Sequence, residues 1–259
     1  MSNQPLIIGH RGSSAVAPEN TLAAFKRAIR EGADGIEFDV RLARDRVPVV
    51  IHDAALTRTA SVNKLVSELT SDELQQIDVG AWFHRSSQVP RTAEAETVPT
   101  LSQVFELFSD EVGSLYLEMK GEPVGKLLPA EVTRLIRKYS FHERVIVESF
   151  DHAAIAEVKR VAPEIRTAAL FERKITRPLL SGRNILGRAH ETRADEIALH
   201  HTLVRDTLVR QARNAGFAVV VWTVEEQHWI ERAQKLGIKA LISNNPAIML
   251  QYRTAATAV

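Results

Sequence analysis

The chain has 259 residues, of which 45% are hydrophobic and 25% charged, an ordinary composition for a globular protein and a length that fits one or two domains. Its formal net charge of +1 excludes a global electrostatic field that would recruit nucleic acid or an anionic membrane surface. The absence of cysteine excludes disulfides and thiolate metal sites.

Short apolar, β-branched runs alternate along the chain with longer segments that have the periodicity of amphipathic helices. This alternation predicts β-α units and a parallel sheet. Eight such runs favour one closed (β/α)8 TIM barrel, an α/β fold in which residues 1–259 form a single domain. The expected strands are 6–9, 35–40, 114–120, 145–150, 166–171, 196–200, 218–224 and 240–243. The expected helices are 21–31, 102–108, 129–139, 152–161, 204–215 and 225–236.

The apolar run at residues 48–51 breaks this alternation, because it follows the second strand too closely to form a parallel neighbour, which needs a dozen or more connecting residues. It can instead fold back as a hairpin. In an antiparallel hairpin the numbers of paired residues have a constant sum, which places His52 level with about Phe38. We therefore expect a hairpin arm above the barrel mouth that brings His52 to the height of Glu37 and Asp39.

Residues 54–98 are a second break, an insertion between the arm and the next helix. They include a short helical pattern at 71–77, the aromatic pair Trp82 and Phe83, and a polar stretch at 91–97. An insertion of this length commonly forms a cap over an active site, and a mobile loop is the alternative. We expect a small cap subregion within the single domain.

Titratable side chains stand at the carboxyl ends of the first three expected strands, which is where barrel enzymes carry their catalytic groups. His10 follows the first strand, Glu37 and Asp39 end the second, and Glu118 and Lys120 end the third. Residues two apart on a strand share a face, so the members of each pair point the same way. Taken singly, such residues are more often solvated or in structural ion pairs. Together, three carboxylates favour a hard divalent cation, Ca²⁺ or Mg²⁺, over zinc.

Several short motifs carry these and other polar or aromatic residues. They are Gly9-His10-Arg11-Gly12, Ala17-Pro18-Glu19-Asn20-Thr21, Glu37-Phe38-Asp39-Val40, His52-Asp53, Pro99-Thr100-Leu101, Leu117-Glu118-Met119-Lys120, Glu148-Ser149-Phe150 and Trp222-Thr223-Val224. Each motif alone is weakly specific. Their order and spacing over nearly the whole chain resemble the glycerophosphodiester phosphodiesterase family.

The resemblance implies a (β/α)8 barrel that uses a divalent cation to hydrolyse glycerophosphodiesters, which are small molecules, to sn-glycerol 3-phosphate and an alcohol. It leaves open which histidine is the acid, and whether water or the glycerol 2-hydroxyl is the nucleophile. Phe150 and Trp222 end strands and would line the substrate pocket, although packing is equally consistent with such rings. Carried onto this chain, the resemblance implies His10 and His52 as general acid and base, Glu37, Asp39 and Glu118 as metal ligands, and Arg11 and Lys120 as the groups that neutralise the phosphate.

Some polar residues around these motifs are expected to have supporting roles. Thr21 is expected to cap the helix that begins there, and Asn20 either caps it or forms a hydrogen bond into the site. Asp53 is expected to support the neighbouring histidine by a hydrogen bond. At the last strand, Ser243 and Asn244 stand where the family commonly has Thr-Asp. Asn244 keeps hydrogen-bonding capacity and loses the charge.

Two other functions are open to a chain of this kind. A related barrel could cleave lysophospholipids or other lipid phosphodiesters, but the modest apolar content of 54–98 argues against long-chain substrates. A protein that binds phosphodiesters without turnover would have no use for paired imidazoles. No apolar stretch approaches the roughly 20 residues that span a bilayer, and residues 1–6 lack the basic region of a signal peptide. We therefore expect a soluble cytoplasmic protein with no nucleic-acid partner and no stable membrane insertion, and the metal, the alcohol group and the oligomeric state are left open.

Overall fold

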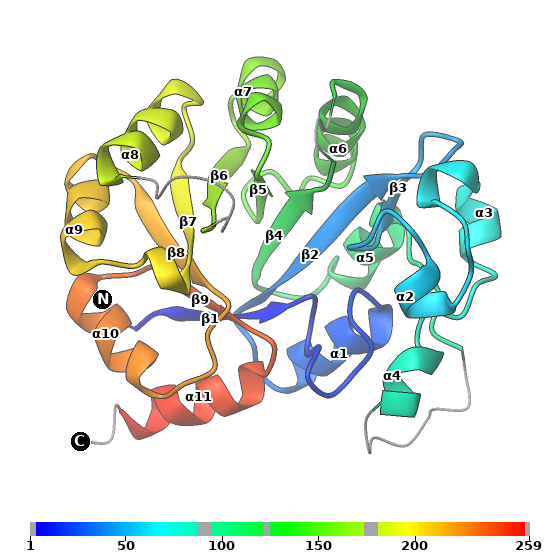
Figure 1. Cartoon of the computed structure of the whole chain (residues 1–259), viewed down its shortest axis with the longest axis horizontal. Helices are drawn as coiled ribbons and strands as arrows, with labels where there is room; N and C mark the ends of the chain where they lie inside the picture. Colours follow the sequence, from blue (N-terminus) through cyan, green and yellow to red (C-terminus); the bar gives the residue numbers. More distant parts are fainter. Residues whose placement is uncertain (1–3, 87–94, 122–124, 174–180, 257–259) are drawn as a thin grey trace.

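The computed structural model describes residues 4–86, 95–121, 125–173 and 181–256, and parallel strands close into a barrel at its centre (Figure 1). Neighbouring barrel strands follow chain order, and the barrel closes because β1 pairs with both β2 and β9. The predicted (β/α)8 fold is therefore confirmed. The barrel strands are β1 (Leu6–His10), β2 (Gly35–Leu42), β4 (Ser114–Met119), β5 (Val145–Ser149), β6 (Arg166–Phe171), β7 (Glu196–His200), β8 (Ala218–Trp222) and β9 (Ala240–Ser243).

Helices surround the barrel and pack their apolar faces against its strands (Figure 1). They are α1 (Leu22–Arg30), α5 (Leu101–Leu107), α6 (Leu127–Lys138), α7 (His152–Val161), α8 (Gly182–Glu191), α9 (Asp206–Asn214), α10 (His228–Leu236) and α11 (Pro246–Ala255). Helices α8 and α11 were not predicted. Gly182 and Gly187 weaken the helical signal of α8, and Pro246, which suits the first position of α11, also resembles a helix stop. Among the described residues, no helix combines the length and the apolar composition needed to cross a membrane.

The strand β3 (Pro48–Val50) lies outside the barrel and pairs with β2 in antiparallel orientation. Val40 is paired with Val50, and continuing this register by two residues sets His52 level with Phe38. The structure thus confirms the hairpin arm predicted from the sequence, including its register.

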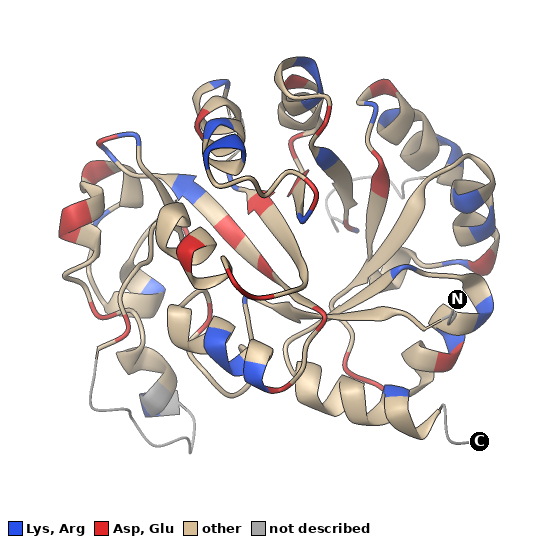
Figure 2. Cartoon of the chain, turned by 180° about the vertical axis from the view of Figure 1, so that it is seen from behind, with Lys and Arg blue, Asp and Glu red and all other residues tan. Residues whose placement is uncertain are grey.

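The insertion after the hairpin folds, in its described part, into short helical turns, and most of the polar stretch at 91–97 lies outside the described residues. Leu56 and Leu74 of the insertion bury their side chains in one apolar cluster with Val49 of β3 and Ile51, which follows it. Both views place the turns beyond the β2–β3 edge of the barrel (Figures 1 and 2), and the cap role stays a prediction. The turns are α2 (Thr57–Ala60), η1 (Val66–Glu68), α3 (Ser71–Leu74) and α4 (Ala81–Ser86).

The amino-terminal end of the barrel is filled by a polar network around Glu196, the fully buried first residue of β7. Its carboxylate accepts hydrogen bonds from the Tyr116 hydroxyl at 3.1 Å and from Nζ of Lys239 at 2.6 Å, and it also contacts Arg166. A buried carboxylate with this many donors is fully paired. This end of the barrel therefore has a structural role, which leaves the carboxyl end for chemistry.

Candidate active site

Three buried acidic side chains meet at the carboxyl ends of β2 and β4. Glu37 and Asp39 share a face of β2, and Asp39 is paired in register with Glu118 on β4. One carboxylate oxygen of each residue lies within 4.8 Å of the other two. The exposed fraction of the residue is 2% for Glu37, 1% for Asp39 and 7% for Glu118. Figure 2 shows several acidic positions on the central strands, whereas most basic positions lie on the outer helices. The predicted metal ligands are thus brought together away from bulk water.

The three acids differ in pKa because they differ in their neighbouring charges. Burial, reinforced by the charge of Asp39, raises the pKa of Glu37 well above its usual range. Burial also raises the pKa of Glu118, to about 7. Burial would raise the pKa of Asp39 as well, but Lys120 and Arg11 outweigh it and hold that pKa well below its usual range. Two of the three acids therefore resist ionisation until further positive charge is near.

The donor set fits a divalent cation. Oδ1 of Asp39 is buried without a hydrogen bond, although Nζ of Lys120 lies 3.1 Å away in an ion pair. A buried carboxylate oxygen of this kind is normally satisfied by a donor or a metal. All candidate ligand atoms in the group are carboxylate oxygens, which suits Ca²⁺ or Mg²⁺.

Arg11 and Lys120, which were expected to neutralise a phosphate, lie directly against these acids. Nε of Arg11 is 3.1 Å from Oδ2 of Asp39, and the Arg11 backbone N–H donates to Oε2 of Glu37 at 3.0 Å. Nζ of Lys120 is 2.8 Å from Oε1 of Glu118. The two cationic side chains are therefore held at the barrel mouth by the same carboxylates that form the candidate metal site.

His10 ends β1 beside this group. Its Nε2 is 3.7 Å from Oε2 of Glu37, and its Nδ1 is 2.6 Å from Oδ1 of Asn244, which also accepts from the Ser14 hydroxyl at 3.1 Å. An amide oxygen only accepts hydrogen bonds, so the proton of the neutral ring is on Nδ1. Burial, helped by the charge of Arg11, lowers the pKa of His10 to about 4. The imidazole is therefore neutral at pH 7.

His52 is held differently, just beyond the hairpin arm. Its Nδ1 lies 2.6 Å from Oδ1 of Asp53, which is the hydrogen bond expected from the sequence. Its carbonyl oxygen accepts from Nε of Arg41 at 2.8 Å. Burial lowers the pKa of His52, whereas the charge of Asp39 and the bond to Asp53 act in the opposite direction. One imidazole of the site thus has an amide partner and the other a carboxylate partner.

Asn20 and Thr21 have separate roles. Oγ1 of Thr21 accepts from the N–H of Ala24 at 3.2 Å and caps α1, as expected. The Asn20 amide nitrogen donates to Oδ2 of Asp39 at 2.7 Å, and its amide oxygen accepts from the Asp39 N–H at 3.2 Å. Asn20 therefore belongs to the site, because it fixes the orientation of a candidate metal ligand.

Several charged residues near the site were missed by sequence reasoning, Arg41, Glu19 and Arg58 among them. Arg41 lies two residues beyond Asp39, so the alternation that paired Glu37 with Asp39 could have found it. It is half-buried, and its two terminal amino groups make no hydrogen bond to any described residue. Glu19 and Arg58 were missed because they meet across 39 residues of sequence, a contact that no local pattern signals.

Aromatic rings border the same mouth. Phe150 follows β5 and Trp222 ends β8, and their rings meet edge to face with centroids 5.6 Å apart. His200, at the end of β7, lies 4.9 Å from the Trp222 ring. Nζ of Lys120 is 5.9 Å from the centroid of Phe150. The two predicted pocket residues thus form one aromatic wall beside a cation, and their contact with substrate stays a prediction.

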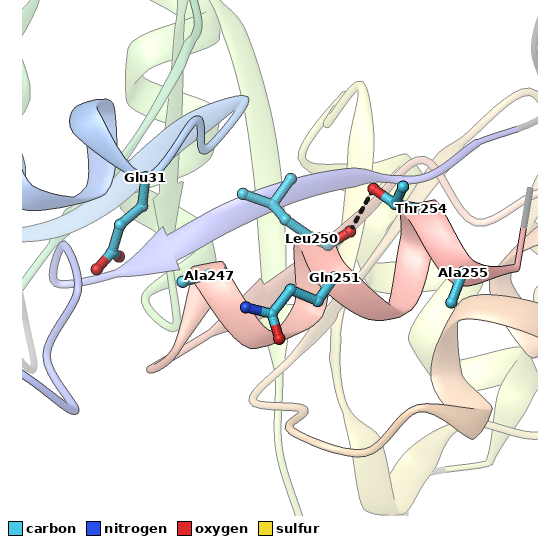
Figure 3. A pocket seen from close by; sticks show the side chains of 6 residues that line it. All are labelled: Glu31, Ala247, Leu250, Gln251, Thr254 and Ala255. Atoms are coloured by element: carbon cyan, nitrogen blue, oxygen red, sulfur yellow. Dashed lines mark hydrogen bonds between the residues drawn. The ribbon is translucent and has the colours of Figure 1, made fainter.

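A pocket of about 520 Å³ lies elsewhere, on the outside of the barrel along α11 and near the end of α1 (Figure 3). None of the predicted site residues lines it. This pocket is therefore separate from the candidate site at the barrel mouth. The residues that line the outer pocket are Glu31, Ala247, Leu250, Gln251, Thr254 and Ala255.

Comparisons with known proteins agree with this geometry. The model of the glycerophosphoryl diester phosphodiesterase family matches residues 10–248. A glycerophosphodiester phosphodiesterase of Caldanaerobacter subterraneus subsp. tengcongensis is 34% identical over 250 residues, which cover 95% of this chain and 96% of that protein. The range matched by the family model therefore includes all the predicted site residues, from His10 to Trp222.

Solved structures share the fold over almost the whole chain. A phosphodiesterase from Oleispira antarctica, in complex with the product sn-glycerol-3-phosphate, has a TM-score of 0.83 and 27% identity, with 96% of each chain covered. A glycerophosphodiester phosphodiesterase from Agrobacterium tumefaciens has a TM-score of 0.79 and 25% identity, with 95% of this chain and 99% of that chain covered.

Proposed function

Because the chain belongs to the glycerophosphoryl diester phosphodiesterase family, we propose that it hydrolyses glycerophosphodiesters to sn-glycerol 3-phosphate and an alcohol with the help of a divalent cation. Membership of the family confirms the resemblance seen in the sequence and makes the protein a phosphoric diester hydrolase. The proposal adds the product, the cation and the roles of individual residues. The Oleispira antarctica structure, with sn-glycerol-3-phosphate as its product, supports the choice of product.

The observation that carries the proposal is the convergence of acids, cations and imidazoles at one end of the barrel. The three acids lie within 4.8 Å of one another and are buried. Burying this many charges without function would cost several kcal/mol of desolvation. A site that must bind a cation and an anionic diester accounts for both signs of charge.

Diester hydrolysis must stabilise negative charge on the phosphoryl oxygens and protonate a poor leaving group. Glu37, Asp39 and Glu118 would hold the cation, which, when bound, supplies positive charge to the phosphoryl oxygens. Arg11 and Lys120 would bind the same oxygens from the protein side. Their side chains are mostly buried, 17% and 13% exposed, and interactions of this kind are stronger away from water.

The two imidazoles would divide the proton transfers. Nδ1 of His10 is engaged by Asn244, and Nδ1 of His52 by Asp53. Nε2 is therefore the atom of each ring that is left to exchange a proton with substrate or water. Diester cleavage needs one group that takes a proton from the nucleophile and one that gives a proton to the departing alkoxide, so both rings are required.

The remaining substrate contacts involve the alcohol side of the diester. Phe150 and Trp222 would pack against it, because their rings border the mouth beside Lys120. We further propose that the substrates are small glycerophosphodiesters and that the protein acts in the cytoplasm. Fractionation of cells that produce the protein tests the location.

The test of activity uses purified protein supplied with Ca²⁺ or Mg²⁺ and either glycerophosphocholine or glycerophosphoethanolamine. Release of sn-glycerol 3-phosphate is followed with a coupled dehydrogenase. A lysophospholipid panel analysed by mass spectrometry runs in parallel. If the protein cleaved only the lysophospholipids, these would be its substrates instead of the small glycerophosphodiesters. If calorimetry showed tight binding of a diester without turnover, the protein would be a binding protein and not an enzyme.

The test of mechanism uses His10→Ala and His52→Ala, each of which should lower kcat by 10²-fold or more, since general acid–base catalysis contributes about 10²–10⁴-fold. His228→Ala is the matched control, because this histidine has a side chain that is 60% exposed on α10. Full activity in both site variants would refute the assigned roles even with the right substrate.

A further inference from the structure

Arg58, on the short helix α2 of the insertion, donates hydrogen bonds to two acids from different loops. Its Nε donates to Oδ2 of Asp53 at 2.6 Å. Its Nη1 and Nη2 donate to Oε2 and Oε1 of Glu19 at 3.0 Å and 2.6 Å. The guanidinium also lies 5.3 Å from the Trp82 ring centroid, which restrains it on its remaining side. All three nitrogens of one side chain are therefore engaged.

Each of these acids has a second contact, and in both cases the partner is a residue of the proposed machinery. Asp53 engages Nδ1 of His52 through its other oxygen at 2.6 Å. Oε1 of Glu19 accepts from Nη1 of Arg11 at 2.9 Å. Arg58 is thus linked through Asp53 to the imidazole of His52 and through Glu19 to the guanidinium of Arg11, with a single acid between them in each case.

Stability alone does not explain this network. The Arg58 side chain is 41% exposed, and ion pairs of exposed side chains contribute only about 0–1 kcal/mol. The bonds to Glu19 are, however, bidentate, with each terminal nitrogen donating to a different carboxylate oxygen, an arrangement that fixes orientation as well as distance. We therefore expect the Arg58 guanidinium mainly to fix the positions of Glu19 and Asp53.

We propose that Arg58 is a positioning residue that joins the insertion to both halves of the active site, acting on His52 through Asp53 and on Arg11 through Glu19. The inference rests on the proposed function for the roles of His52 and Arg11. The insertion would then be needed for catalysis through one side chain, even where it does not cover the substrate.

The kinetic test compares Arg58→Gln with variants of the two acids. Asp53→Asn should mainly lower kcat, and Glu19→Gln should mainly raise KM. Arg58→Gln should do both, with kcat lower by roughly 10- to 100-fold, since small misplacements of catalytic groups have effects of this size. Because Arg58 acts on His52 through Asp53, the double variant Arg58→Gln/Asp53→Asn should have the kcat of Asp53→Asn alone. The inference would be overturned if the two substitutions lowered kcat independently, so that their fold-changes multiplied in the double variant, or if Arg58→Gln left kcat unchanged.

Arg44→Gln is the matched control. Arg44 also ties the hairpin to the insertion, by an ion pair with Glu73 at 3.0 Å, and it touches no residue of the site. It should leave kcat and KM unchanged. If Arg58→Gln does not fold, Arg58→Lys carries the same test, because an ammonium cannot reproduce the fork. A kcat of Arg58→Lys equal to that of the unchanged protein would then overturn the inference.

A second readout needs no turnover and so separates this inference from the proposed function. The ¹⁵N resonances of the His52 ring report its hydrogen bond to Asp53. They should move in Arg58→Gln and stay in place in Arg44→Gln. Unmoved His52 resonances in Arg58→Gln would reject the positioning role whatever the activity, whereas a protein that shows the shift but no phosphodiesterase activity would contradict only the proposed function.

Discussion

The amide oxygen of Asn244 accepts a hydrogen bond from Nδ1 of His10 at 2.6 Å, the same distance at which Asp53 engages His52. The acceptor is itself held in place, because the Asn244 backbone N–H donates to Glu225 at 2.8 Å. A neutral amide orients the His10 ring without adding negative charge. The departure from the family pattern noted in the sequence thus keeps the orientation of the imidazole and changes its electrostatics.

Asn244→Asp should raise the pKa of His10. A carboxylate at hydrogen-bond distance favours the protonated ring, and opposite charges this close shift a pKa by roughly 1–3 units. The value should therefore rise from about 4, and the ring should begin to protonate at higher pH than in the unchanged protein. An NMR titration of the His10 ring protons in metal-free protein measures this. The exposed control Asn214→Asp should leave the titration in place, and an unmoved or lowered His10 pKa in Asn244→Asp would contradict the prediction.

Binding of a divalent cation should stabilise the fold, because only the folded chain brings the three buried acids together to hold it. At a hundred times Kd the gain is about 2.7 kcal/mol, which corresponds to a Tm increase of roughly 5–10 °C for a chain of this size. Chelation should remove both the increase and the activity. Thermal unfolding with added Ca²⁺ or Mg²⁺ measures the increase in Tm. Glu118→Gln should abolish it, and Glu226→Gln, a change at a side chain that is 71% exposed, should keep it. An equal increase in both variants would show that the cation binds elsewhere.

Arg41→Gln should raise KM for the diester by about tenfold with a smaller change in kcat. The terminal amino groups of Arg41 make no hydrogen bond to the described residues and are free to contact an anion. A charge-assisted hydrogen bond is worth about 1.5–3 kcal/mol, and we take the lower end because the side chain is only half-buried. Steady-state kinetics of this variant beside Arg210→Gln, an exposed change on α9, checks the prediction. An unchanged KM would show that Arg41 only holds the His52 carbonyl.

His152 should make stability depend on pH. Its Nε2 lies 3.1 Å from the Leu170 carbonyl oxygen, its ring packs on Phe171, and burial lowers its pKa from 6.5. Below pH 6.5 the unfolded chain therefore binds more protons than the folded one, so the free energy of unfolding falls as pH decreases until the folded pKa is passed. Urea unfolding between pH 7.5 and 5 should show a weaker dependence in His152→Gln. Equal slopes for the two proteins would contradict it.

The sequence predicts the side chains at the strand ends better than it predicts the contacts between them. The closed parallel barrel brings every strand end to one mouth, which is why Glu118 could be assigned to the same site as Glu37 and Asp39. The hydrogen bond between His10 and Asn244 joins residues 234 positions apart. No local pattern specifies such a bond, because it depends on how loops settle on the finished barrel.

The short strand β3 also has a consequence for how accurately His52 is placed. Val49 packs into the apolar cluster of the insertion, whereas Val50 packs with the cluster between the barrel and its helices. A slip of one residue against β2 would move His52 by about 3.4 Å and would exchange the surroundings of both valines. Two hydrophobic environments on opposite faces of one strand therefore fix the register of β3 against β2, so that the packing of its neighbours protects the placement of His52 in addition to the bonds that His52 makes to Asp53 and Arg41.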